Sequence, residues 1–293
     1  MFCFKPTGEV MVVSKSVEES GQAIGQQLHD LTAEQLTLAA KHLARLDEDI
    51  HRGVHEARKS MRRARAVLAL GRKTLGRQAR HLSEAIGRLG RGLSPLRDAQ
   101  ALVETLERLS RKEAALDAVI PQAIDAAKQR RTQVLAGVLA RDPGMQSRQR
   151  RILAFVRQLA ALRWHRVTIN SIDKSLERSR KRADKAEAAA QRSQEAEVWH
   201  TLRRKVRRVR QQYGMLDEIA PHLQELPGHQ ELAECLGESQ DDALLLARCG
   251  TRSPFAPAER AILRRFAKER LAAIRAPKRK GGNGKAGSTQ EGS

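Results

Sequence analysis

One pattern of residues occurs twice in this chain of 293 residues, about 145 positions apart. The copies read VHEARKSMRRAR (54–65) and WHTLRRKVRRVR (199–210). Counted from the histidine, both have basic residues at offsets +3, +4, +7, +8 and +10, and apolar residues at −1, +2, +6, +9 and +13. Because a helix turns by about 100° per residue, the apolar offsets share one side, with the histidine and the cations beside them. Each copy therefore predicts an amphipathic helix with a core-facing stripe next to a cationic stripe.

These cationic stripes are predicted to bind phosphate groups. Like charges at i,i+4 spacing destabilise a helix by a few tenths of a kcal/mol per pair, and Glu56 is the only acid among both sets. Nine of the ten matched basic residues are arginine, whose planar guanidinium can donate to two phosphate oxygens at once. A bound anion would raise the pKa of each histidine, and the cationic neighbours would partly offset this. The predicted phosphate-binding residues are His55, Arg58, Lys59, Arg62, Arg63, Arg65, His200, Arg203, Arg204, Arg207, Arg208 and Arg210. Lys205 falls off the stripe and is expected to be a solvated charge.

A second repeated segment, which we call the aspartate echo, follows each copy. LSPLRD (93–98) and LGESQD (236–241) both begin with leucine, end with aspartate and lead into an apolar helical pattern. Asp98 and Asp241 have two open interpretations, either as ordinary helix-start caps or as residues that orient the arginines. The paired echoes indicate two related helical halves arranged about a pseudo-twofold axis.

The fold class predicted from the sequence is all-α, because helix formers dominate, proline is scarce and no convincing strand periodicity occurs. We expect an N-terminal half over about 16–145 and a C-terminal half over about 146–276. Residues 1–15 are expected to be poorly ordered, and the Gly/Ser/Lys-rich residues 277–293 to form a disordered basic tail. Predicted helices span about 16–29, 33–74, 77–92, 95–117, 121–141, 145–164, 170–190, 194–220, 229–248 and 256–275. Their breaks are placed at DLT, with Thr32 as a cap, and at GLSP, RDPG, ELPGH and GTRSPFAP.

The overall charge of +21 predicts attraction to polyanions. The chain has three scattered cysteines, Cys3, Cys235 and Cys249, and neither a signal-peptide core nor a membrane-spanning apolar run. We therefore expect a soluble cytoplasmic protein without disulfides and without a membrane partner. The sequence makes no prediction of oligomeric state.

The register HxxRxxxRRxR, present twice and followed by LRD and LG…QDD, resembles the conserved histidine α-helical domain, or CHAD, family over roughly residues 16–276. The resemblance implies two four-helix bundles related by approximate twofold symmetry, with a basic groove or channel between them. It also implies binding of inorganic polyphosphate, often at polyphosphate granules. Two positions depart from the family pattern. Lys59 replaces a usual apolar residue, and the Glu-Ser of LGESQDD replaces a usual Glu-Leu.

Nucleic acid, either duplex DNA or RNA, is the alternative partner, because charge alone does not separate it from polyphosphate. The chain has only eight aromatic residues to stack on bases, and Trp164 is either a stacking residue or a core residue. An enzyme is not expected, since no Walker A loop or catalytic triad is recognisable and the predicted groove lacks carboxylates to hold Mg²⁺. Asp47, His51 and His55 form a conceivable metal row on one helix, but the second copy does not repeat it. We therefore expect neither metal nor cofactor.

Overall fold

The computed structural model describes residues 10–217, 219–223 and 229–276. Throughout these residues every regular element is a helix, which confirms the all-α class. The α-helices are α1 (Val10–Ala44), α2 (Leu46–Leu70), α3 (Arg72–Gly92), α4 (Ser94–Ser110), α5 (Ile120–Leu139), α6 (Gln146–Leu159), α7 (Ile169–Ala190), α8 (Ala196–Leu216), α9 (His229–Arg248) and α10 (Pro257–Arg275). Short 3₁₀ turns occur at η1 (Ala114–Leu116), η2 (Pro143–Met145) and η3 (Trp164–Arg166). The expected tail, 277–293, and residues 1–9 lie outside the described ranges.

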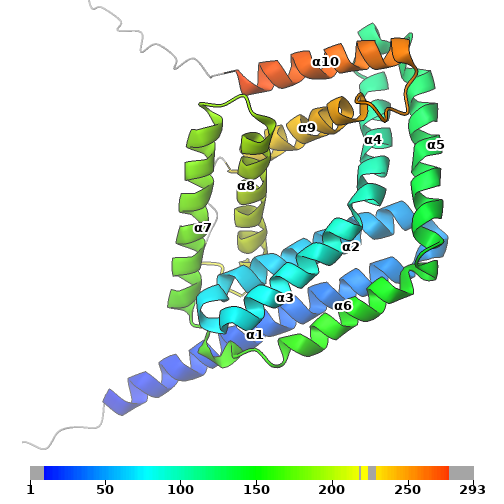
Figure 1. Ribbon diagram of the computed structural model, residues 1–293. Coiled ribbons are helices and arrows are strands. Elements are labelled where there is room, and N and C mark those ends of the chain that lie inside the picture. Colours follow the sequence, from blue (N-terminus) through cyan, green and yellow to red (C-terminus); the bar gives the residue numbers. More distant parts are fainter. Residues whose placement is uncertain (1–9, 218, 224–228, 277–293) are drawn as a thin grey trace, which may run out of the picture.

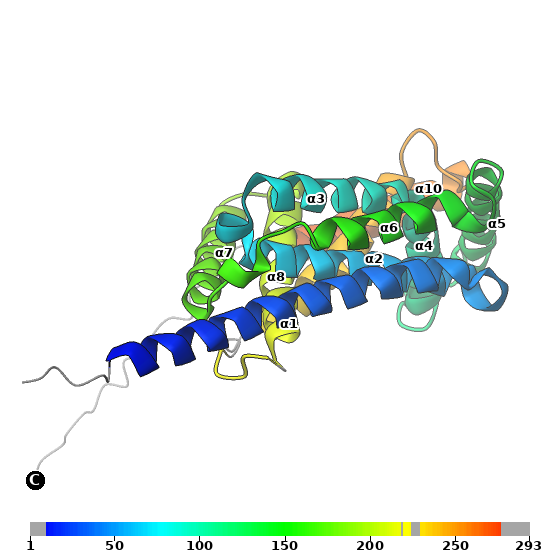
Figure 2. The ribbon, with the colours of Figure 1, turned by 90° about the horizontal axis from the view of Figure 1, so that it is seen from below.

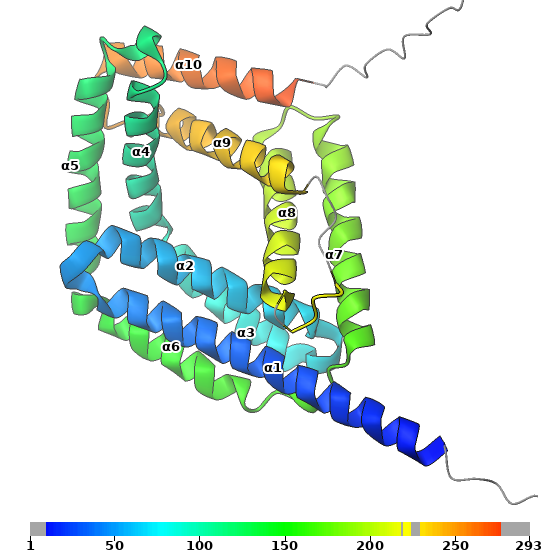
Figure 3. The ribbon, with the colours of Figure 1, turned by 180° about the vertical axis from the view of Figure 1, so that it is seen from behind.

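Pairs of consecutive helices build the molecule. Helix α1 packs on α2, α4 on α5, α7 on α8 and α9 on α10. These pairs form the sides of a quadrilateral frame, with α2, α4, α8 and α9 on its inner side (Figure 1). Helices α3 and α6 thicken the side that contains α1 and α2, as the views from below and behind show (Figures 2 and 3). The repeated segments thus lie on inner helices, the basic copies on α2 and α8 and the aspartate echoes on α4 and α9.

The core-facing stripes of the two basic helices are confirmed. Buried residues are Val54, Ala57, Met61, Ala64 and Leu68 on α2, and Leu202, Val206, Val209 and Tyr213 on α8. Trp199, at the start of the second stripe, is half-buried and donates its indole N–H to the Ser193 carbonyl at 2.8 Å. Burying a large aliphatic side chain contributes about 1.5–3 kcal/mol, so these stripes hold the rotation of each helix and thereby the direction of its cations.

Two hydrophobic clusters form the core, and neither corresponds to one predicted half. Helices α7 and α8 share the larger cluster with α1, α2, α3 and α6. Helices α4 and α5 share the smaller cluster with α9 and α10. The structure therefore does not confirm a division into two bundles, because helices of both sequence halves contribute to both clusters.

The predicted break at Thr32 is wrong. Helix α1 runs through this residue, and the buried Thr32 hydroxyl donates to the Leu28 carbonyl at 2.7 Å instead of capping a new helix. The chain turns near Asp49, which has extended backbone geometry and accepts the N–H groups of His51 and Arg52 at 3.0 Å. A carboxylate in this position caps the helix that follows.

The two echoes also fold differently from one another. Pro95 lies in the first turn of α4, where its missing N–H is tolerated, and Leu93 separates α3 from α4. The matching Leu236 lies inside the continuous α9. The predicted breaks at GLSP, RDPG and GTRSPFAP agree with helix ends, whereas part of ELPGH lies outside the described residues.

No helix in the described part of the chain is both long enough and apolar enough to cross a membrane.

Candidate functional site

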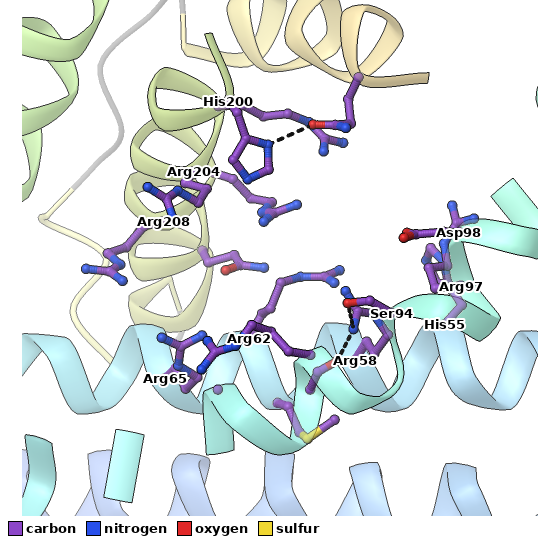
Figure 4. A pocket seen from close by; sticks show the side chains of 18 of the residues that line it. His55, Arg58, Arg62, Arg65, Ser94, Arg97, Asp98, His200, Arg204 and Arg208 are labelled. Carbon is purple, nitrogen blue, oxygen red and sulfur yellow. Dashed lines mark hydrogen bonds between the residues drawn. The ribbon is translucent and has the colours of Figure 1, made fainter. Parts of the chain in front are cut away.

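A cavity of about 720 Å³ lies where α2, α3, α4, α8 and α9 meet. Figure 4 shows side chains from these helices converging on it, with α8 on one side and Asp98 on the opposite side. Its wall carries ten arginine or lysine residues and two carboxylates. The basic residues are Arg58, Arg62, Arg65, Arg91, Arg97, Arg203, Arg204, Lys205, Arg207 and Arg208, and the acids are Asp98 and Asp241.

Nine of the twelve predicted site residues line this cavity: His55, Arg58, Arg62, Arg65, His200, Arg203, Arg204, Arg207 and Arg208. Lys59, Arg63 and Arg210 are not part of its lining. The Lys59 ammonium instead lies 3.3 Å from the Glu56 carboxylate on the same helix. The charge of Lys59, which departs from the family pattern, is therefore neutralised by Glu56 on the same helix.

The two basic helices present different arcs to the cavity. On α2 the repeat residues that line the cavity are the histidine and the basic residues at offsets +3, +7 and +10. On α8 the lining also includes the basic residues at offsets +4 and +8, but it does not include the one at +10. Helix α2 contacts α1, α3, α4, α7 and α8, so its +4 and +8 flank is turned away, while α8 packs chiefly on α7, α9 and α2. The repeat is thus not used symmetrically.

Three cations of the cavity wall were not among the predicted site residues. Lys205 lines the cavity, which corrects its interpretation as a solvated charge. Arg91 on α3 and Arg97 on α4 also line it. A signal for Arg97 exists in the LSPLRD echo, where it immediately precedes Asp98. No repeat signal marks Arg91, which lies two residues before Leu93, because the residue two positions before the matching Leu236 is Glu234.

Arg62 and Arg207 form the electrostatic centre of the cavity. Burial and then, in decreasing order, the charges of Arg207, Arg58, Arg203 and Arg97 together lower the pKa of Arg62 to about 9. Burial and neighbouring cations, of which Arg203 is the strongest, lower the pKa of Arg207 to about 10. Both side chains stay charged at neutral pH. Among the described residues, neither has a hydrogen bond or an ion pair with a carboxylate, and the buried Nε of Arg62 has no partner.

The offset +3 arginines face the repeated aspartates. Arg58 donates to the Gly90 carbonyl and to Ser94 Oγ at 3.0 Å, which ties α2 to the α3–α4 junction. Burial lowers the pKa of the Arg58 guanidinium, and the charge of Asp98 acts against that lowering. Asp241 acts in the same way on Arg203.

The structure favours the arginine-orienting interpretation of both aspartates over a cap. Asp241 lies in the middle of α9 and accepts a hydrogen bond from Arg108 of α4 at 3.0 Å. Asp98 lies in α4 beyond its first turn, and the charges of Arg58, Arg248 and Arg97 act on it. Burial is the strongest influence on Asp98 and raises its pKa.

The two histidines occupy matching positions. His200 Nδ1 lies 3.0 Å from Oε1 of Gln240, the residue before Asp241. His55 lies near Arg97, the residue before Asp98 (Figure 4). Burial lowers the pKa of His55 and the charge of Arg97 lowers it further. In the absence of an anion this histidine is therefore neutral at pH 7.

The cavity lining, as described, contains no phenylalanine, tyrosine or tryptophan. Trp164 is a core residue, since it is 5% exposed and donates its indole N–H to the Leu159 carbonyl at 2.9 Å. Of the conceivable metal row, the Asp47 side chain lies outside the described residues and is separated from His51 by the turn at Asp49. Among described side chains, no group of three or more His, Cys, Asp or Glu residues is placed to hold a metal ion.

A family model described as CHAD domain matches residues 30–250, which include both basic helices and both aspartate echoes. The chain belongs to the CHAD family. A crystal structure of the CHAD domain from the plant Ricinus communis has a similar fold, with a TM-score of 0.53 and 19% sequence identity over 88% of this chain and 90% of that chain. No curated protein is similar enough to count as a match. The CHAD match ends before α10, which nevertheless shares the smaller core cluster.

Proposed function

We propose that this CHAD protein binds inorganic polyphosphate in the cavity between α2, α4, α8 and α9. The observation that carries the proposal is the pair Arg62 and Arg207, two half-buried guanidinium groups that repel one another and have no carboxylate partner in the described structure. A buried charge is stable only when it is paired. An anion in the cavity would supply the missing partner, and the bidentate donor geometry of arginine suits phosphate oxygens.

A chain made only of phosphate fits this cavity better than nucleic acid does. Proteins that bind single strands usually stack bases on aromatic side chains, and the described cavity lining has none. An unbranched phosphate chain carries its charges without bulky side groups, so it can contact cations from α2 and α8 at once. Nucleic acid is therefore the second candidate.

The proposal describes a binding protein rather than an enzyme. Phosphoryl transfer usually requires carboxylates that hold Mg²⁺. The two carboxylates of the cavity wall face arginines instead, since Asp241 pairs with Arg108 and Asp98 lies near Arg58. A cytoplasmic location, expected from the three scattered cysteines, belongs to the same proposal, as does an association with polyphosphate granules, which the family resemblance implies.

The deciding experiment compares cations on the same two helices that differ only in their direction. The variant Arg62→Gln/Arg207→Gln removes two charges from the cavity, and Arg63→Gln/Arg210→Gln removes two charges outside its lining. We expect the first pair to weaken binding of long-chain polyphosphate by at least about 100-fold, at about 1.5–3 kcal/mol per charge-assisted contact. The second pair should change binding less than about threefold.

Isothermal titration calorimetry at fixed salt measures both effects, and circular dichroism verifies helicity. Equal losses in the two double variants would show that binding depends on net charge and not on the cavity. Competition with duplex DNA and RNA at the same salt concentration tests the second candidate, which a preference for either nucleic acid would promote.

A further inference from the structure

Basic side chains continue beyond the cavity on the side of α8 that faces α7. Lys205 and Arg208 line the cavity, and Figure 4 shows Arg208 on the side of α8 away from Asp98. Arg72 at the start of α3 and Arg182 on α7 are exposed and do not belong to the cavity lining. Both α3 and α8 contact α7, so these elements meet at one corner of the frame. We call Arg72, Arg182, Lys205 and Arg208 the α8 edge.

The members of the α8 edge are close enough to influence each other electrostatically. Burial is the main cause that lowers the pKa of Arg208, and the charges of Arg65, Arg182 and Arg72 follow. Burial also lowers the pKa of Lys205, with Arg208 and Arg182 as its strongest cationic neighbours. The edge is therefore a group of neighbouring cations, of which Lys205 and Arg208 line the cavity and Arg72 and Arg182 lie outside its lining.

The wall of the cavity opposite the α8 edge is formed by α4 and α9, and we call it the α4–α9 wall. It differs from the edge because cations on these helices already have acidic neighbours. Arg108 pairs with Asp241 across α4 and α9 at 3.0 Å. Arg97 lies 3.2 Å from Glu104, and Asp98 attracts Arg58 and Arg248. A part of a polyanion that extended beyond the cavity on this side would meet carboxylates.

The α8 edge has no comparable neutralisation within the described residues. No hydrogen bond or ion pair joins its four cations to a carboxylate there. Three acids of α7 lie beside other cations, since Glu177 contacts Lys181 at 2.6 Å and Asp173 and Asp184 act on Arg180. Because like charges at close range repel, the edge gains from an external anion.

We propose that the α8 edge is a second subsite, which binds the part of a long polyphosphate chain that leaves the cavity. This inference rests on the proposed function. The chain would pass from Arg62 and Arg207 over Arg208 toward Arg72 and Arg182, because the carboxylates of the α4–α9 wall disfavour the other direction. A chain of a few phosphates would occupy the cavity alone, so the edge makes the protein selective for chain length.

The test compares tripolyphosphate with long-chain polyphosphate on the full chain. The variant Arg72→Gln/Arg182→Gln should weaken binding of the long chain by about three- to tenfold and reduce its salt dependence by about one counterion per arginine. Its affinity for tripolyphosphate should change less than about twofold. The matched control is Arg150→Gln/Arg151→Gln, two exposed arginines of α6 at the end that follows α5, across the molecule from α7 (Figure 1). It should have no effect beyond about twofold on either ligand.

Three results would overturn the second subsite: an equal loss for both chain lengths, no loss for the long chain, or the same loss in the α6 control. The Arg62→Gln/Arg207→Gln variant separates this question from the proposed function, because it should lose both ligands. If the wild-type protein binds neither ligand, the proposed function itself fails.

Discussion

Lys59 and Arg62 lie three residues apart on α2, yet their surroundings are opposite. The Lys59 ammonium is partly exposed and lies 3.3 Å from Glu56. Arg62 is surrounded by other arginines in the cavity, and burial with their charges lowers its pKa to about 9. The charge of Arg62 therefore serves the proposed binding function and makes the protein less stable when no ligand is bound.

The variant Arg62→Gln should therefore stabilise the protein in the absence of an anion. The folded state holds the Arg62 proton less tightly than the unfolded chain, so at pH 7 the full penalty is present, and it fades as the pH rises above about 9. We expect the free energy of unfolding at pH 7 to rise by about 1–2 kcal/mol. The gain over wild type should shrink above pH 9.

Urea denaturation in a buffer without phosphate or sulfate measures this difference. The control variant Arg63→Gln, outside the cavity lining, should stay within about 0.5 kcal/mol of the wild type. A loss of stability in Arg62→Gln would mean that the guanidinium has an internal partner in solution.

At the scale of the helices, ion pairs hold α4 and α9 in place, the helices that carry Asp98 and Asp241. Arg108 of α4 reaches Asp241 of α9. Arg270 of α10 contacts Asp242 at 3.0 Å and Glu113 at 2.9 Å, and its guanidinium lies 5.5 Å from the centre of the Phe266 ring. Asp242 is completely buried, which raises its pKa. These contacts join the two sides of the frame that carry the α4–α9 wall.

We expect Arg270→Met to lower the free energy of unfolding by about 3 kcal/mol, because it leaves the buried Asp242 without its cation. The matched control is Arg265→Met on the same helix. Arg265 is 77% exposed and its nearest carboxylate, Glu269, is 4.0 Å away, so the change should be within about 0.5 kcal/mol. Thermal and urea unfolding measure both variants, and equal effects would contradict the role of Asp242.

At the scale of the whole molecule, the frame brings like charges together around its centre. The chain carries a net charge of +21, and ten of its cations line one cavity. Hydrophobic burial on the outer sides of α2 and α8 holds these helices against that repulsion. An anion in the cavity would reduce this repulsion.

Polyphosphate should accordingly stabilise the folded protein. At a ligand concentration about 100 times Kd, linkage adds about 2.7 kcal/mol, which corresponds to a rise in Tm of about 5–10 °C for a domain of this size. The rise should shrink as the salt concentration increases. Differential scanning fluorimetry measures it, with the Arg62→Glu/Arg207→Glu variant as the control. A rise of the same size in that variant would place the ligand outside the cavity.

Much of the molecule is predictable from the sequence because helical periodicity is a local property. The matched registers around His55 and His200 correctly predict the buried stripes of α2 and α8, and the Pro95 and Pro143 regions correctly predict helix ends. The break at Thr32 fails because a threonine can also donate to the carbonyl one turn earlier inside a helix, as its hydroxyl does to Leu28. Local sequence does not distinguish these two hydrogen bonds.

The spacing of residues along the chain is sufficient to predict that two helices carry the same register of histidine, arginine and apolar residues, because spacing along a helix sets the angle between side chains. Which of those arginines meet depends on how the helices pack against one another. Arg208 lines the cavity while the equivalent Arg63 does not, and Lys205 and Arg91 join the wall without a partner in the repeat. The physical reason is that the rotation of each helix relative to its neighbours depends on the packing of every helix against it, and α2 and α8 are packed against different neighbours.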